Sequence, residues 1–172
     1  VVDCTGGGGG HSTAALARLG ENGRLIVIDR DPDAIKVLTE RFSDDKRVTV
    51  VHENFFNISS ILVALGINGA DSIMADLGVS SYQLDEAERG FSFHHDAPLD
   101  MRMSKTGRSA KELVNELSAG ELKRILYDYG EEKFAPRIVS AIIREREKAP
   151  IETTFQLADI IREAYPAAAR RD

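Results

Sequence analysis

Five consecutive glycines, residues 6–10, constrain this chain more than any other feature, because they join an apolar run to a helical pattern. Residues 1–3 have the character of the end of a buried strand, and residues 12–19 form a short helical pattern that stops at Gly20. Glycine adopts positive φ angles and lets a ligand approach the backbone closely. The N–H groups at the following helix start face an anion or carboxylate. A flexible linker seldom joins such elements, so the pattern predicts a ligand-binding strand–loop–helix.

Apolar runs of strand length alternate with helical patterns in the first hundred residues. Three further strands are expected over residues 24–29, 48–51 and 72–76. Pro32 opens a helix at its first turn, where proline is tolerated. Strands that alternate with helices indicate βαβ units and a parallel sheet covered on both faces. The sequence therefore predicts an α/β, Rossmann-like sheet domain over residues 1–102.

From about residue 103 the strand-like runs stop and helical periodicity takes over. Capping boxes, which mark helix starts, are expected for three pairs: Ser109 with Glu112, Ser118 with Glu121, and Thr153 with Gln156. A last helix is expected over residues 155–165. Residues 103–172 are thus predicted to form an all-helical domain, inserted into or appended to the sheet domain.

The net charge of the chain is negative, whereas a protein that binds nucleic acid by bulk charge is positive, and the charge is unevenly distributed along the chain. The formal net charge is −6, from −8 over residues 1–100 and +2 over residues 101–172. Binding of nucleic acid by bulk charge alone is therefore excluded, and an anionic partner is expected to meet the second part. The single cysteine, Cys4, excludes a disulfide framework within the chain and favours a reducing, cytoplasmic location. No apolar run is long enough to predict a transmembrane helix.

The glycine pattern narrows the choice of ligand. A Walker A loop needs a Gly-Lys-Ser/Thr sequence, which this loop lacks. A strict dinucleotide fingerprint would need glycine where His11 or Ser12 stands, although a looser variant stays open. An acid before the glycines, here Asp3, is typical of S-adenosylmethionine sites, where it approaches the methionine amino group directly or through water. The loop therefore favours S-adenosylmethionine.

Two positions after later strands suit the adenosine half of such a ligand. Asp29 ends the second strand, where an acid in a doubly wound fold accepts hydrogen bonds from ribose hydroxyls. The alternative is a solvated acid that caps the next helix, a role that suits Asp31 better because it directly precedes Pro32. Phe55 follows the third strand and is expected either against adenine or in the core.

Asp76 follows the fourth strand, at the edge where open α/β sheets bind ligands. Methyl transfer is an in-line displacement that depends mainly on position and orientation. An amine with a delocalised lone pair is helped by an acceptor for its N–H, which makes Asp76 the candidate catalytic residue, with Ser80 and Ser81 as secondary contacts. The alternative is that Asp76 caps a turn before Gly78. Of the Asp/Asn-Pro-Pro-aromatic motif common in amino-methyltransferases, only the acid is present.

Long motifs spread over most of the chain resemble the RsmH (MraW) family. They are Asp3-x-Thr-x-Gly-x-Gly-Gly-His-Ser12, the run from Val27 to Pro32, Asp76-Leu-Gly-Val-Ser-Ser81, Gln83-Leu-Asp-x-Ala-Glu-Arg-Gly-Phe-Ser-Phe93, Pro98-Leu-Asp-Met-Arg-Met103, and Tyr129-Gly-Glu-Glu132 with Phe134-Ala135.

The resemblance implies an S-adenosylmethionine-dependent enzyme that methylates cytosine N4 in bacterial 16S ribosomal RNA, near the decoding site of the small subunit. It also implies a sheet domain with a helical insert. No membrane partner is expected, because no long apolar run is present; no metal is expected either, and the oligomeric state stays open. Together with Asp3 and Gly7 from the loop, the implied cofactor contacts are Gly9, Gly10, His11, Asp29, Phe55, Asp76 and Gln83.

The stretch after Gln83 is rich in charges and aromatic residues. A base taken out of its stack needs aromatic faces and hydrogen bonds to its edge, and Phe91, Phe93 and Arg102 are candidates for that contact. Equally, they could clamp the helical part onto the sheet domain. The adjacent histidines His94 and His95 are interpreted as surface residues, since neighbouring histidines rarely present both rings to one metal.

Two departures from the family bear on activity. Gly6 replaces a larger apolar residue, which predicts a looser loop. Members of the family are longer than this chain. The chain is therefore expected to be a fragment with an incomplete sheet, doubtful activity and a tendency to aggregate, and its last residues are 167–172.

Alternative functions are a catalytically incomplete S-adenosylmethionine-binding fragment, or a methyltransferase of the same fold with a small-molecule or protein substrate. A nicotinamide dehydrogenase ranks last.

Overall fold

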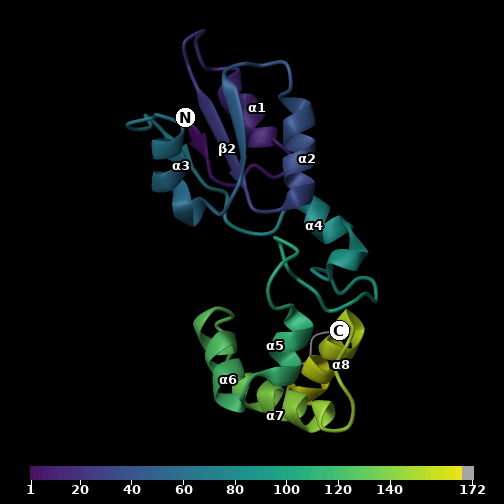
Figure 1. Cartoon of the computed structure of the whole chain (residues 1–172). Helices are drawn as coiled ribbons and strands as arrows, with labels where there is room; N and C mark the ends of the chain where they lie inside the picture. The colour runs from purple at the N-terminus through teal and green to yellow at the C-terminus, as the bar shows by residue number, and fades with distance from the viewer. Residues whose placement is uncertain (168–172) are drawn as a thin grey trace. The chain divides into compact units, whose positions relative to one another are not determined.

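The computed structural model describes residues 1–167, which form two compact units (Figure 1). The first unit contains Val1–Ser80 and the short segment Met103–Lys105. The second contains Ser81–Arg102 and the described residues from Thr106 onward. Residues 81–102, which the sequence analysis counts with the sheet domain, thus pack with the helices. The expected tail of residues 167–172 lies, apart from Ala167, outside the described residues.

The first unit is built on a parallel sheet with the strand order β3-β2-β1-β4. Its central pair runs in register from Leu25 opposite Val48 to Asp29 opposite His52. The prediction of an α/β, Rossmann-like fold with a parallel sheet is confirmed. The strands are β1 (Val2–Asp3), β2 (Leu25–Asp29), β3 (Val48–His52) and β4 (Ile73–Met74).

Helices cover both faces of this sheet because the side chains of β2 alternate between them. Leu25 and Val27 pack with Leu38 and with residues of the first helix, whereas Ile26 and Ile28 pack with Ile61 on the other face. All six named side chains are buried. Burial of one such side chain stabilises the fold by about 1.5–3 kcal/mol. The helices are α1 (Gly10–Leu16), α2 (Pro32–Arg41) and α3 (Ile58–Ala64), with the 3-10 turn η1 (Phe55–Asn57) before α3.

The second unit is helical, and its core gathers around the middle of α7. Ile138 and Ile142 lie in this core with Leu122, Val114 and Leu99. All three predicted capping boxes are present at the starts of α5, α6 and α8. Two short elements between residues 81 and 89 were not predicted. The helices are α4 (Ser81–Asp85), η2 (Ala87–Arg89), α5 (Ala110–Glu116), α6 (Ala119–Asp128), α7 (Ala135–Arg146) and α8 (Thr154–Ala164).

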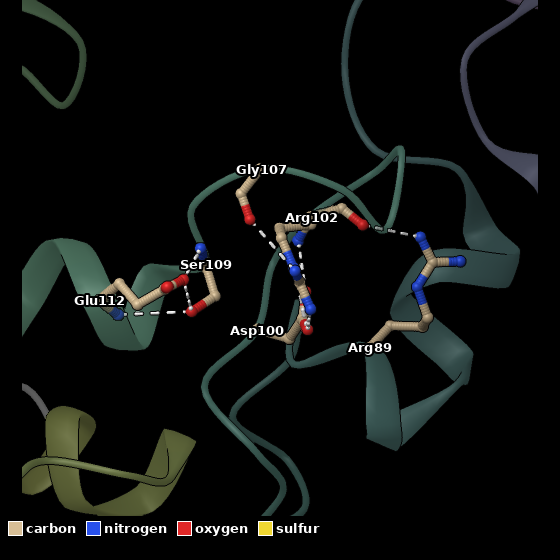
Figure 2. A network of polar contacts seen from close by, with 6 residues as sticks. All are labelled: Arg89, Asp100, Arg102, Gly107, Ser109 and Glu112. Atoms are coloured by element: carbon tan, nitrogen blue, oxygen red, sulfur yellow. Dashed lines mark hydrogen bonds and ion pairs between the residues drawn. The ribbon is translucent and has the colours of Figure 1, made fainter.

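A hub of polar contacts around Arg102, drawn in Figure 2, organises the loop before α5. The Arg102 guanidinium donates to both Asp100 carboxylate oxygens, with Nη2 2.6 Å from Oδ2, and to the Gly107 carbonyl at 3.1 Å. Arg89 donates to the Arg102 carbonyl at 3.0 Å. Hydrogen bonds from Arg102 hold the pKa of Asp100 below its usual range, and the same bonds raise the pKa of Arg102.

Within residues 1–167, none of the helices has the length and apolar character needed to cross a membrane.

Candidate functional site

Acidic residues stand at the carboxyl ends of three neighbouring strands. Asp3 ends β1, Asp29 ends β2 and Asp76 follows β4 after one residue. Because the strands are parallel, these ends meet at one edge of the sheet, the edge at which open α/β sheets bind ligands. The structure therefore brings the predicted loop, ribose and catalytic positions to the same edge of the first unit.

Asp3 is buried, with 2% of its surface exposed, and its carboxylate is engaged in the glycine loop. It accepts hydrogen bonds from the Thr5 N–H at 3.1 Å and from the Ser12 hydroxyl at 2.6 Å. These bonds tie the strand end to the first turn of α1. The observed contacts give Asp3 a role in ordering the loop, and its contact with a methionine amino group stays a prediction.

The glycine loop makes a tight turn before α1. The Gly9 N–H donates to the Gly6 carbonyl at 2.8 Å, and Gly7 and Gly9 have φ angles of 50° and 82°. Gly9 is the residue before α1, so the helix starts earlier than the predicted residue 12. The left-handed conformation at Gly7 and Gly9 favours glycine.

Gly6 does not loosen the loop, contrary to the prediction. A Cβ atom at Gly6 would lie 2.6 Å from side-chain carbons of both Leu38 and Val27, and the Gly6 N–H donates to the Ile28 carbonyl at 3.0 Å. The backbone at Gly6 is therefore packed closely against the core, and the space beside it is too small for a Cβ atom unless Leu38 and Val27 move. By contrast, a Cβ at Gly8 or Gly10 would meet no described atom within 4 Å.

Asp29 connects the end of β2 to the glycine loop. Its Oδ2 accepts from the Gly7 N–H at 2.7 Å, and its Oδ1 accepts from the Asp31 N–H at 2.8 Å. A carboxylate oxygen has two lone pairs, so each retains one for a further donor. Asp31 caps α2 by accepting from the Asp33 N–H at 3.0 Å, as predicted. Because Asp31 takes the capping role, Asp29 stays the candidate for ribose binding.

Phe55 begins η1, and two residues separate it from the end of β3. Its side chain is 39% exposed, which does not support the alternative of a plain core residue. Asn54 fixes this turn, since its side-chain oxygen accepts from the Phe56 N–H at 3.0 Å. Phe55 therefore offers an aromatic surface near the edge of the sheet, and its contact with adenine stays a prediction.

The backbone of Asp76 is anchored while its carboxylate faces solvent. The Asp76 N–H donates to the Thr5 hydroxyl at 2.8 Å, which links the ends of β4 and β1. The Asp76 side chain is 76% exposed, and its Oδ2 lies 3.9 Å from Nδ1 of the exposed His11. Ser80 Cβ lies 3.9 Å from the position that a Cβ on Gly7 would take. The geometry leaves the Asp76 carboxylate accessible from solvent.

Thr5 was missed as a site residue, although it stands in the quoted Asp3-x-Thr motif. Its hydroxyl joins two strand ends, and a role of this kind depends on a partner 71 residues away. A hydroxyl residue directly after a strand and before a glycine loop was the available signal.

The other candidate residues belong to the second unit. Ser81 begins α4, and Gln83 on the same helix is buried with 5% exposure. Phe91 lies half-buried, its ring centroid 5.9 Å from the Arg89 guanidinium carbon, and Phe93 is exposed. Because Arg102 is engaged by Asp100 and Gly107, its contacts favour a structural role. The binding roles of these residues stay predictions.

Across residues 1–167, no group of three or more histidine, cysteine, aspartate or glutamate side chains is placed to hold a metal ion. His94 contacts the ring of Phe93 at a centroid distance of 5.3 Å. The structure therefore offers no assembled ligand set around His94 and His95 in that part of the chain.

Comparison with known proteins places this geometry in a family. A profile of the MraW methylase family matches residues 1–172. The chain is 54% identical over 172 residues to the ribosomal RNA small subunit methyltransferase H of Clostridium botulinum (strain Kyoto / Type A2), which covers 99% of this chain and 56% of that protein. It is 49% identical over 173 residues to the protein of the same name from Symbiobacterium thermophilum, with 99% and 54% covered. The chain thus spans about half the length of these relatives, and it belongs to the MraW methylase family.

Proposed function

We propose that this chain carries the cofactor-binding part of an S-adenosylmethionine-dependent methyltransferase whose substrate is the N4 amine of a cytidine in small-subunit ribosomal RNA. The observation that carries the proposal is the pairing of Asp29 with Gly7 at the edge where β1 and β2 end. It places a carboxylate suited to ribose beside a glycine loop suited to the methionine half. The names of the relatives, ribosomal RNA small subunit methyltransferase H, support the RNA substrate. A cytoplasmic location follows from the proposed substrate.

The residues at this edge fit S-adenosylmethionine. Space around Gly8 and Gly10 lets a ligand lie against the loop backbone. The lone pairs that Asp29 retains suit the two ribose hydroxyls, and the exposed ring of Phe55 suits the adenine. When bound, S-adenosylmethionine supplies a methyl group made electrophilic by its sulfonium centre.

The chain's own residues have three tasks in the proposed reaction. The backbone of Gly9 lies against the methionine half, and the N–H groups at Gly10 and His11 face its carboxylate. Asp29 orients the ribose. The exposed Asp76 carboxylate accepts a hydrogen bond from the cytidine amine, which directs the nitrogen lone pair along the line of displacement. Gln83, Ser80 and Ser81 are proposed as further contacts, and Phe91 and Phe93 as faces for the base.

Calorimetric titration of S-adenosylmethionine into the wild-type chain and an Asp29→Ala variant tests the cofactor site. Charged hydrogen bonds contribute about 1.5–3 kcal/mol, so the variant is expected to bind roughly ten- to a hundredfold more weakly. Methyl transfer from labelled S-adenosylmethionine to unmodified small ribosomal subunits, compared with total protein extract, tests the substrate class. Equal affinity of the two proteins for the cofactor would contradict the site.

A second candidate function is a cofactor-binding chain without catalytic activity. The chain spans 56% of the length of the first relative, so cofactor binding and methyl transfer are tested separately. S-adenosylmethionine binding that depends on Asp29, together with no methyl transfer to small subunits, would support this alternative. Transfer to a protein or small molecule would instead support a methyltransferase with another substrate.

A further inference from the structure

The segment Met103–Lys105 packs with the sheet unit, although the residues on both sides of it belong to the second unit. The Lys105 ammonium lies 2.8 Å from Oδ1 and 2.7 Å from Oδ2 of Asp33, in the first turn of α2. Arg30 Nη2 lies 3.4 Å from the Ser104 hydroxyl oxygen. Two side-chain contacts therefore join this segment to the turn that follows β2.

Lys105 has a φ angle of 58°, in the left-handed region that non-glycine residues rarely adopt. Such a conformation persists where the surroundings hold it in place, and it is common at functional sites. The bidentate contact with Asp33 is a physical reason for this residue to stay in that conformation.

A continuous chain of hydrogen bonds leads from Asp33 to the glycine loop. The Asp33 N–H donates to Asp31 at 3.0 Å, the Asp31 N–H donates to Asp29 at 2.8 Å, and the Gly7 N–H donates to Asp29 at 2.7 Å. Three carboxylates thus stand within five residues of one turn, and their mutual repulsion disfavours the compact arrangement. Lys105 brings a positive charge to this turn from a distant part of the sequence.

We propose that Lys105 is a positioning residue for the cofactor: through Asp33 it holds the acidic turn of residues 29–33 so that the Asp29 carboxylate meets the ribose. This inference rests on the proposed S-adenosylmethionine site and adds a residue to it that lies outside the loop and strand ends. By thermodynamic linkage, cofactor binding and docking of the 103–105 segment strengthen each other by the same factor.

The first test measures S-adenosylmethionine affinity by calorimetry in the full chain. Exposed ion pairs contribute modestly to stability and binding, so Lys105→Gln is expected to bind about threefold more weakly than wild type. Lys105→Arg, which keeps the charge, is expected to restore the affinity. Lys36→Gln is the matched control, because it removes one lysine charge from an exposed position of α2. Thermal unfolding of each variant separates positioning from a loss of the fold.

The second test uses the wild-type chain and needs no substitution. Trypsin cleaves after Lys105 only when the segment leaves its docked conformation. Saturating S-adenosylmethionine is therefore expected to slow this cleavage about threefold, by the linkage above. Cleavage after the exposed Lys46 in the same unit is expected to stay unchanged.

The outcomes separate the two proposals. Cofactor binding that depends on Asp29 but is equal in Lys105→Gln and Lys36→Gln would overturn the role of Lys105 alone. No cofactor binding by the folded wild-type chain would overturn the proposed function, and the role of Lys105 with it. Where Lys105→Gln does not fold, the trypsin rates in the wild-type chain decide, and unchanged cleavage at Lys105 overturns the inference.

Discussion

Two aspartates, one in each unit, show how differently the same carboxylate group is held in two regions of the molecule. Asp29, at the sheet edge, accepts two backbone N–H groups and keeps lone pairs for further donors. Asp100, in the hub of the second unit, accepts from the Arg102 backbone and from two nitrogens of its guanidinium (Figure 2). Both carboxylates carry the same charge, but only the Asp29 carboxylate keeps much of its capacity to accept hydrogen bonds. This remaining capacity distinguishes the candidate site from a residue that serves the fold.

The largest effect is expected at Gly90, which follows Arg89 in the chain and where the backbone of residues 98–100 leaves no room for a side chain. A Cβ at Gly90 would collide with the Pro98 carbonyl oxygen and lie 2.8 Å from the Asp100 nitrogen, and Gly90 has a φ angle of 69°. Gly90→Ala is expected to lower the free energy of unfolding by about 3 kcal/mol, measured by urea denaturation. In the control Gly120→Ala, at an exposed helical position, stability should stay the same or rise by up to about 1 kcal/mol. Similar losses in both variants would contradict the tight approach at Gly90.

Exchanging each aspartate for asparagine compares the two carboxylates directly. Asp100→Asn is expected to lower the free energy of unfolding by about 1–2 kcal/mol, because it removes charged hydrogen bonds to a half-exposed arginine. Asp29→Asn is expected to weaken S-adenosylmethionine binding about tenfold. Calorimetry measures cofactor affinity and thermal unfolding measures stability, and each variant is expected to lower mainly one of the two. If Asp100→Asn weakened the cofactor as much as Asp29→Asn, the contrast between site and scaffold would fail.

Within the glycine loop, packed and open positions should respond differently. Gly6→Ala places a methyl group against Leu38 and Val27 and is expected to cost about 1–3 kcal/mol of stability. Gly8→Ala, in open space, is expected to change stability by less than about 0.5 kcal/mol. Thermal unfolding of the two variants gives the comparison. An equal response would mean that the backbone at Gly6 is free to move away from the core.

The smallest effect is a dependence of stability on pH. The folded-state pKa of Asp100 is lowered, so its contribution is present above the unfolded pKa of about 3.9 and is lost as pH falls through the folded pKa. Stability of the wild-type chain should therefore decline more steeply below about pH 4 than that of Asp100→Asn. Unfolding curves at several pH values measure this difference, and parallel curves would show that Asp100 contributes little.

Local patterns in the sequence predicted the elements that depend on near neighbours. The alternation of apolar runs predicted the parallel strands, and Ser109, Ser118 and Thr153 were recognised as caps from a partner three residues away. The position of Asp31 before Pro32 predicted the cap of α2. These features are decided within one helical turn or one strand, so the sequence by itself contains the information.

Tertiary structure decided the features that depend on distant partners. Burial of Asp3 and close packing at Gly6 follow from side chains on α1, β2 and α2. The ion pair between Lys105 and Asp33, which are 72 positions apart in the chain, could likewise not be predicted from a local pattern. Arg102 differs, because its partners Asp100 and Gly107 lie only two and five residues away in the chain, and the folded conformation of the loop sets these contacts. Whether a polar group is available to a ligand depends on which partners the folded chain brings to it, and local sequence patterns do not specify those partners.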